Sequence, residues 1–510
     1  MKGKGDKLIS GSLLRFLNLM VLGLSTFYLT PFIIQHIGQT MFGFWSLVGS
    51  LMVASAFLDL GLGTALKRFI PKHYAANNMK GVNTVFCSTL FVLLIAGIVV
   101  AFSAIVLAKP LYHWIGGNIE ARIFTTVFLV LGIDAAFQFP MRAFLGYFEG
   151  RLRYDFISLV DIIKILFRTA MIFYFLLHNY KVVAMAVIAL TVNILGSFLL
   201  IAYFLIKYKD LSIKLSYIST KTIKEVLNYS YKNVVAAIAE LMRLQISNLV
   251  IATFVGINAV AIYAIASRIQ QFLTDAVSAF IGQTVPVFSD IDATGNRESL
   301  KRAYYLLIKI STILSVYLGG MAVIAGKNFI LRWVGPDFES SYTVLVVLTF
   351  GITISLTIYP TYNLLRGISE HIIIMICSLG EGICNLILSL VLVNHYSIIG
   401  VAFATMIPIT ISAGLVLPYM TSRRVTYIRL PEFYLRQYGP VFLKSLMVLT
   451  LIYFVVSPLL SPDYFHLMIV GLISLFYFPL LYIIGFSRLE KDEYLMIYER
   501  IQNLLRVKGK

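Results

Sequence analysis

Ten ionisable side chains stand in stretches of this 510-residue chain that are otherwise apolar. A charged group near the centre of a bilayer costs roughly 2.5 to 3.5 kcal/mol, so ten of them cannot all face lipid. They must pair with one another or line a hydrated space inside the protein. The ten are Asp59, Asp134, Asp161, Lys164, Arg168, Glu240, Arg243, Arg268, Asp275 and Glu381.

The spacing of these residues places several of them on common helix faces, because residues three and four apart lie on one side of a helix. Asp161, Lys164 and Arg168 share one face, and Glu240 and Arg243 share another. A third stripe contains Arg268, Gln271, Asp275, Ser278 and Gly282. Polar faces from both ends of the chain therefore predict a hydrated central cavity.

Arginine is the residue type that indicates the ligand. Its planar guanidinium can donate two parallel hydrogen bonds to a phosphate group. We therefore predict that Arg168, Arg243 and Arg268, together with Lys164, bind an anionic substrate. The remaining candidates for polar lining or ion coupling are Asp161, Glu240, Gln271, Asp275, Glu381, Asp59 and Asp134.

A second interpretation of these charges involves no ligand. Glu240 with Arg243, and Asp161 with Lys164, are three residues apart and could neutralise each other within one helix. Asp59 and Asp134 are equally open to a role in helix packing. The three arginines fit this interpretation less well.

The elements that position these residues are membrane spans. Apolar residues make up 59% of the chain and charged residues 13%, which excludes a soluble globular protein. Crossing the hydrocarbon core takes about 20 apolar residues in a helix. We count fourteen such runs and predict an all-α polytopic membrane protein. The runs lie near residues 12–36, 42–66, 84–108, 121–146, 155–178, 182–206, 230–255, 257–286, 303–326, 341–365, 371–393, 397–420, 437–457 and 464–486.

The basic residues predict the orientation of these spans, because cytoplasmic loops collect Lys and Arg. The chain has 42 Lys and Arg. The ones in predicted external loops are Lys109, Arg122, Lys181, Lys327 and Arg332. Both termini are therefore expected in the cytoplasm. The net charge of +18 then reflects topology and contact with anionic lipid, rather than nucleic-acid binding.

Landmarks in the sequence recur in order at a nearly constant separation. The pairs are Gly38 with Gly256, Trp114 with Trp333, and Pro140 with Pro360. We predict two six-helix repeats around the cavity, related by an axis along the membrane normal. The predicted segments are a first half at 1–208, a cytoplasmic linker at 209–229, a second half at 230–420, and two further helices with a cytoplasmic tail at 421–510. The second copy carries more charge, so its first two helices are expected to make more substrate contacts than helices 1 and 2.

Two local patterns lead to further expectations. The linker stretch TKTIKEVLNYS contains a capping-box pattern from Thr222 to Glu225, and fits either an amphipathic helix on the lipid surface or a solvated linker. Trp45, Trp114 and Trp333 fall in or beside predicted external loops. Anchoring at the membrane interface is the simplest role for them, and stacking on a ligand is the alternative.

Metal and disulfide chemistry is not indicated. Cys87, Cys377 and Cys384 all fall within predicted spans, and the seven histidines show no ligand spacing. We therefore expect no metal site and no cofactor, although a coupling ion, proton or sodium, remains open.

Two segments resemble a known family of transporters. The run IGQTMFGFWSLVGSLMVASAFLDLGLGTALKRFI resembles the opening hairpin of Wzx-type polysaccharide flippases, in the multidrug/oligosaccharidyl-lipid/polysaccharide transporter superfamily. The run ISNLVIATFVGINAVAIYAIASRI resembles the seventh and eighth helices of the same family. Many members carry an Asp before that second apolar run, where this chain has Ser247 and Asn248. An ion-coupling role attached to that Asp does not carry over.

The resemblance implies a flippase that moves undecaprenyl-diphosphate-linked oligosaccharide across the bacterial inner membrane by alternating access. Such a protein would serve the synthesis of a surface polysaccharide, O-antigen (lipopolysaccharide) or capsule, alongside a polymerase and a chain-length regulator. Relatives expose a cationic cavity to the lipid diphosphate, in agreement with the arginines above.

Three other functions remain as alternatives. A multidrug exporter of the same superfamily should have an acidic cavity for cationic drugs, which the arginines disfavour. A polymerase-type membrane enzyme needs acids or bases presented to the sugar, and the short external loops disfavour it. A pure scaffold leaves the ten buried charges without a role.

Overall fold

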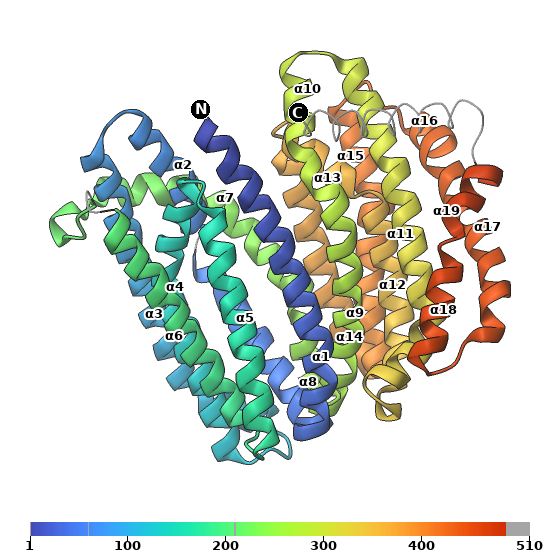
Figure 1. Cartoon of the computed structure of the whole chain (residues 1–510), viewed down its shortest axis with the longest axis horizontal. Helices are drawn as coiled ribbons and strands as arrows, with labels where there is room; N and C mark the ends of the chain where they lie inside the picture. Colours follow the sequence, from blue (N-terminus) through green and yellow to red (C-terminus); the bar gives the residue numbers. More distant parts are fainter. Residues whose placement is uncertain (1, 60, 209–210, 486–510) are drawn as a thin grey trace. The chain divides into compact units, whose positions relative to one another are not determined.

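The chain is built almost entirely from helices. The computed structural model describes residues 2–59, 61–208 and 211–485, and within this range it describes the side chains except those of 2–13, 56, 231–237, 239, 240, 243, 244, 283, 484 and 485. No strand occurs in the described residues. The predicted all-α membrane fold is confirmed, and the elements cluster into two compact units that are described separately below (Figure 1).

The first unit comprises Met1–Ala264 and Gly382–Val401. Its helices up to the linker are α1 (Lys2–Ala54), η1 (Ser55–Asp59), α2 (Leu62–Ala75), α3 (Met79–Ile115), α4 (Ala121–Gly150), α5 (Tyr154–Leu177) and α6 (Val182–Lys207). They are followed by η2 (Leu215–Tyr217), α7 (Thr220–Leu244), α8 (Ile246–Phe254) and the start of α9 (Ile257–Ile281).

The second unit comprises Ile265–Glu381 and Ala402–Lys510. After α9 it contains η3 (Gly282–Thr284), α10 (Val285–Ala293), α11 (Arg297–Trp333), η4 (Pro336–Phe338), α12 (Ser341–Thr357), α13 (Tyr359–Gly367) and α14 (His371–Ile411), whose middle belongs to the first unit. The last elements are η5 (Ser412–Val416), α15 (Leu417–Arg424), α16 (Leu430–Glu432), η6 (Phe433–Tyr438), α17 (Gly439–Val456), η7 (Ser457–Leu459), α18 (Tyr464–Ser474), α19 (Tyr477–Leu480) and η8 (Leu481–Gly485). The predicted segment boundaries and the twofold repeat stay predictions.

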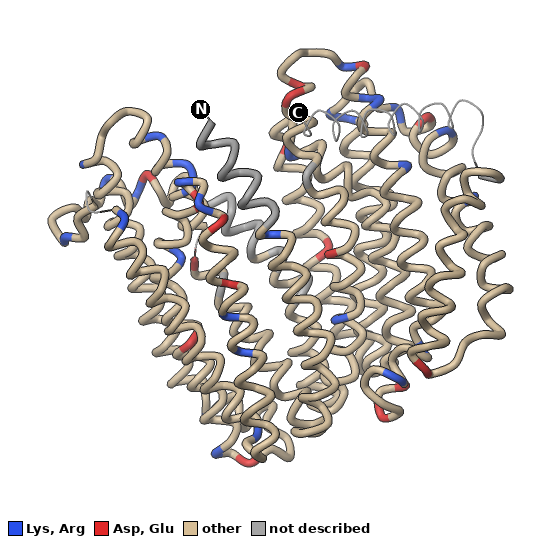
Figure 2. The backbone as a smooth tube through the Cα atoms, in the orientation of Figure 1, with Lys and Arg blue, Asp and Glu red and all other residues tan. Residues whose placement is uncertain are grey.

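Many of the long helices are apolar enough to cross a membrane. Among the described residues 8 helices meet that standard, or 9 if the bent pair α12 and α13 counts as one span. Two long helices each cover one expected span and the beginning of the next: α1 breaks at Gly38 (φ 78) and α14 at Ser397 (φ 53). The predicted count of fourteen is compatible with this arrangement. Figure 2 shows charged residues gathered near helix ends and sparse along the middles of the long helices.

The second expected span, at 42–66, does not run as one helix. Helix α1 ends at Ala54, η1 follows, and α2 begins at Leu62 after Gly61. Gly61 adopts φ 69, a left-handed conformation that favours glycine over residues with a Cβ, and this turn separates the two helices. The turn also leaves Asp59 at the end of η1, close to α4.

Aromatic packing holds α3, α4 and α6 together in the first unit. Phe86 of α3 stacks on Phe204 of α6 with ring centroids 5.2 Å apart, and Tyr147 of α4 meets Phe204 at 5.1 Å. The Tyr147 hydroxyl shares a 2.7 Å hydrogen bond with that of Tyr74 on α2. This core fixes α4 against α6, which brings their polar residues into register elsewhere along the two helices.

The linker between the predicted halves continues as a helix packed on the protein. The predicted capping box from Thr222 to Glu225 is wrong, because α7 already begins at Thr220. The N-cap residue is Ser219, whose side chain accepts a hydrogen bond from the Thr222 amide at 3.4 Å. The Ser219 amide donates to Ser88 Oγ at 3.0 Å, and Ser230 Oγ donates to the Gly61 carbonyl at 3.2 Å. The first part of α7 is therefore bound to α3 and to the turn before α2, and is not a free linker.

The close approach of α1 to the first turns of α9 gives a stability prediction. A Cβ at Gly43 would overlap the Ile257 carbonyl oxygen and lie 3.1 Å from the Ala261 amide nitrogen, both backbone atoms that cannot rotate away. Gly43→Ala is expected to destabilise the protein by ~1–3 kcal/mol. The matched change Gly23→Ala, on the same helix with no atom within 4 Å, should be neutral or stabilising because alanine favours helix. Thermal unfolding of the detergent-solubilised variants would measure the difference, and equal melting temperatures would contradict it.

Candidate functional site

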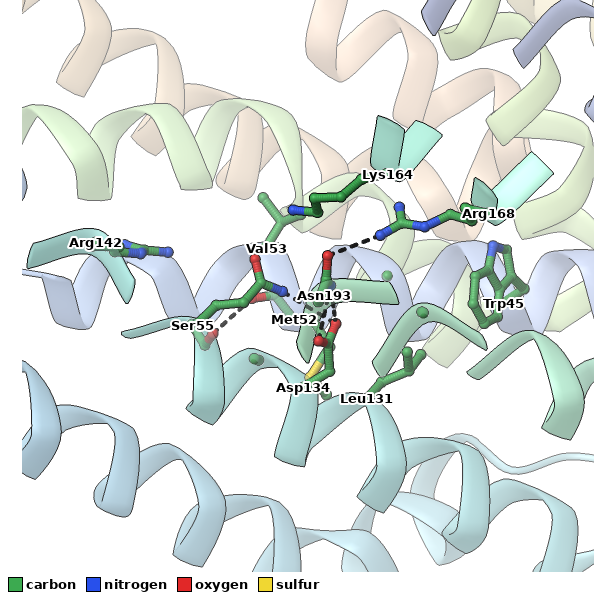
Figure 3. Close-up of a pocket in the computed structure, with 14 residues that line it drawn as sticks. Trp45, Met52, Val53, Ser55, Leu131, Asp134, Arg142, Lys164, Arg168 and Asn193 are labelled. Atoms are coloured by element: carbon green, nitrogen blue, oxygen red, sulfur yellow. Dashed lines mark hydrogen bonds between the residues drawn. The ribbon is translucent and has the colours of Figure 1, made fainter. Parts of the chain in front are cut away.

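A pocket of about 600 Å³ lies inside the first unit, between five of its helical segments. The α1 and η1 segments contribute Trp45, Gly49, Met52, Val53 and Ser55. The rest of the lining comes from α4 (Leu131, Asp134, Ala135, Gln138, Arg142), α5 (Lys164, Arg168) and α6 (Ala189, Asn193). We call this the cationic pocket, because three of its side chains are basic and one is acidic (Figure 3).

A hydrogen-bonded pair from α4 and α6 forms one wall of the cationic pocket. Asn193 Nδ2 donates to both carboxylate oxygens of Asp134, each at 2.9 Å, and Gln138 Nε2 donates to Oδ2 at 3.1 Å. Asp134 is 7% exposed and Asn193 is 6% exposed. Buried polar groups need such partners, and here the carboxylate is satisfied by two neutral amides.

Arg168 extends this network from α5. Its Nη2 donates to Asn193 Oδ1 at 3.0 Å, so the Asn193 amide lies between the guanidinium and the Asp134 carboxylate, as Figure 3 shows. Its Nε is buried and has no hydrogen-bond partner among the described residues. A buried donor without an acceptor costs about 1–3 kcal/mol, and an oxygen-rich ligand in the pocket would remove that cost.

Lys164 lies one turn before Arg168 on α5. Its Nζ is 3.9 Å from Asp161 Oδ1, so the pairing within the helix that the sequence left open does occur. Gly196 on α6 makes room for the aliphatic part of the Lys164 side chain, because a Cβ at position 196 would overlap it. The ammonium group still lines the cationic pocket, and the pairing alone does not account for its placement.

Arg142 and Asp59 form a second ion pair beside the pocket. Arg142 Nη1 lies 3.5 Å from Asp59 Oδ2, and the guanidinium sits 4.7 Å from the centre of the Phe139 ring. Both charged side chains are partly exposed, at 29% and 20%. This pair ties η1 to α4 and gives Asp59 a packing role, one of the two roles that its sequence context suggested.

The structure places the other predicted residues outside the cationic pocket. On α9, Gln271 Nε2 donates to Asp275 Oδ1 at 2.9 Å, and both side chains are exposed, as is Arg268. Glu381 of α14 is 3% exposed. The side chains of Glu240 and Arg243 lie outside the described residues, so the expected predominance of the seventh and eighth helices stays a prediction.

Sequence reasoning missed Asn193, Gln138 and Arg142. Asp134, Gln138 and Arg142 are spaced four apart, and this stripe on α4 was visible in the sequence. Asn193 has only the small hydroxyl residues Thr191 and Ser197 near it in an otherwise apolar stretch of α6, and this gave no comparable signal.

The three tryptophans have different surroundings, and the anchoring role stays a prediction for Trp45 and Trp114. Trp45 lines the cationic pocket, and Trp114 is 58% exposed. Trp333 is 2% exposed, with its ring stacked 5.4 Å from Phe329 and 6.5 Å from Phe272, so the interfacial anchor predicted for it is wrong. Apolar neighbours within its own unit enclose it.

Metal ligation has no candidate in the part of the chain that the structure describes. No three His, Cys, Asp or Glu side chains there are grouped closely enough to hold an ion. Whether an ion couples to transport stays a prediction.

Comparison with protein families matches residues 14–292 to "Polysaccharide biosynthesis protein". The match covers more than half of the chain. The chain belongs to this family. The family match includes every residue that lines the cationic pocket.

A relative in Bacillus subtilis has similar length. The membrane protein EpsK is 22% identical over 437 residues, which cover 80% of this chain and 83% of EpsK. Solved structures share the fold of this chain at lower sequence identity. The lipid II flippase MurJ in its inward closed conformation is 14% identical, covers 92% of this chain and 97% of its own, and has a TM-score of 0.72. An inward-facing multidrug resistance MATE transporter of the MOP superfamily is 18% identical, covers 80% and 98%, and has a TM-score of 0.68.

Proposed function

We propose that this protein is a flippase for a diphosphate-linked, lipid-anchored oligosaccharide, and that the cationic pocket holds the diphosphate during translocation. One observation carries the proposal. Arg168 is fixed by Asn193 inside an apolar helical unit, while its buried Nε has no acceptor among the residues that the structure describes. A phosphate oxygen supplies that acceptor, and Lys164 adds a second positive charge nearby.

The size and charge of the pocket support an anionic substrate over a cationic one. Its volume of about 600 Å³ is within the usual range for small-ligand sites. Its lining has three basic side chains and the single carboxylate of Asp134. Two of the three also pair with carboxylates outside the lining, Arg142 with Asp59 and Lys164 with Asp161, so Arg168 is the charge that most favours an anion. A multidrug exporter for cations would favour the reverse balance.

The proposal extends to the setting of the protein. We place it in the bacterial inner membrane with both termini in the cytoplasm, moving an undecaprenyl-diphosphate carrier for O-antigen or capsule synthesis. A polymerase and a chain-length regulator would act on the product, and a proton or sodium gradient would drive the cycle. The protein acts as a transporter and catalyses no sugar chemistry.

Reconstitution tests this function directly. Purified protein in liposomes is expected to move a fluorescent undecaprenyl-diphosphate oligosaccharide between leaflets, measured by the fraction that a membrane-impermeant quencher reaches. Empty liposomes, and liposomes with an unrelated polytopic protein, provide the controls. In cells, deletion of the gene should leave the lipid-linked unit on the cytoplasmic leaflet. No leaflet exchange above the controls would refute the proposal, and chain elongation by purified protein alone would establish a polymerase instead.

A further inference from the structure

A second cavity of about 380 Å³ lies between α5 and α6 in the same unit. Its α5 wall is Phe167, Met171 and Phe175, and its α6 wall includes Ala184, Val187 and Ile188. We call it the α5–α6 groove. Lys181, at the N-cap of α6, is its one charged lining residue.

The groove and the cationic pocket are built on the same two helices. Lys164 and Arg168 line the pocket, while Met171 and Phe175 line the groove, and the steps of four, three and four put all four on one face of α5. Phe175 is seven residues after Arg168, or roughly 10 Å along the helix at about 1.5 Å per residue. The charged face of α5 therefore continues into an apolar one.

The groove opens where the protein meets hydrocarbon. Phe167 is 42% exposed and Val187 is 46% exposed, whereas Ile188 is 4% and Val192 is 2% exposed on the inner wall. Phe167 lies near the middle of α5 and Val187 in the second turn of α6, and exposed apolar side chains at such positions in a membrane protein face lipid chains. A lipid chain can therefore enter the groove from the side without crossing a polar surface.

We propose that the α5–α6 groove binds the isoprenoid chain of the substrate while its diphosphate occupies the cationic pocket. The inference rests on the proposed function, because such a substrate joins an anionic head to a long apolar chain. Bulk phospholipid fits less well. Its headgroup stays at the interface, whereas one end of the groove lies next to Arg168, near the middle of α5. A chain leaving the pocket at that depth belongs to a lipid whose head is already inside the protein.

Filling the groove tests the inference. Ala184→Trp should lower the transport of a diphosphate oligosaccharide on an undecaprenyl chain by about tenfold, equivalent to about 1.4 kcal/mol. Transport of the same oligosaccharide on a short isoprenoid chain, which does not reach along the groove, should be unchanged. Leu195→Trp is the control, because Leu195 is on the same helix, is 47% exposed, and lines neither cavity. Equal losses for both chain lengths, or none for either, would overturn the inference.

Photolabelling gives a second measurement that does not depend on the variant folding. A diazirine in the isoprenoid chain should crosslink to peptides of α5 and α6 that contain Met171 and Val187, and unlabelled substrate should compete. Labelling confined to other helices would overturn the inference, as would groove labelling by a diazirine phospholipid that substrate fails to displace. If wild-type protein moves neither chain length, the proposed function itself fails, which is a separate result.

Discussion

Replacing Arg168 with alanine is expected to lower flipping of the lipid-linked oligosaccharide by about tenfold to a hundredfold, with normal amounts of protein in the membrane. The loss follows from removing charge-assisted hydrogen bonds to a phosphate group, worth about 1.5–3 kcal/mol. Arg168→Lys should retain part of the activity, because it keeps the charge and loses the planar fork. The measurement is the initial rate of leaflet exchange in liposomes.

The matched control for this prediction is Arg122→Ala. Arg122 is also an arginine and lies in the first turn of α4, but it is exposed and does not line the cationic pocket. Its removal should leave flipping unchanged. Normal transport by Arg168→Ala, with the protein folded, would show that the pocket does not hold the diphosphate.

Changing Asn193 to aspartate should abolish transport by a different route. A carboxylate at 193 would face the Asp134 oxygens, which Asn193 Nδ2 now contacts at 2.9 Å, and would pair directly with Arg168. Two adjacent buried carboxylates repel each other, so the folded protein is also expected to be less stable. Leaflet exchange should fall by more than about tenfold, since Arg168 loses its hydrogen bonds to phosphate.

A double variant separates the two consequences of this change. With Asp134→Asn and Asn193→Asp together, an amide again donates to a carboxylate, and the melting temperature should recover. Transport should stay low, because Arg168 remains paired with the new carboxylate. Recovery of transport together with stability would show that Asn193 serves only packing and does not position Arg168.

The sequence was sufficient to predict the setting of the site. Charges are too costly in lipid to be placed at random, so Lys164 and Arg168 on one face of an apolar helix indicated an internal cationic surface. In the structure Lys164 and Arg168 line the same pocket, together with Asp134, which is also among the predicted residues. Hydrophobic runs also predicted the membrane fold, because helix length is set by bilayer thickness.

The sequence did not predict which helices contact each other. The contact of Asn193 with Asp134 depends on how the aromatic core holds α6 against α4, and nothing in either helix alone specifies it. Local breaks were equally hard to predict. Gly61 looked like one more small residue within a span, yet its left-handed backbone ends η1 and begins α2.

Asp161, Lys164 and Arg168 on α5 also bear on how the protein is inserted into the membrane. Helix α5 is not among the helices that are apolar enough to cross a membrane unaided, whereas α4 before it and α6 after it both are. The groups that shelter its charges, Asn193 and Gly196, belong to α6 and leave the ribosome later than α5 does. Entry of α5 and α6 together as a hairpin would keep these charges away from lipid. The residues to which we assign phosphate binding thus also bear on how the helices enter the bilayer.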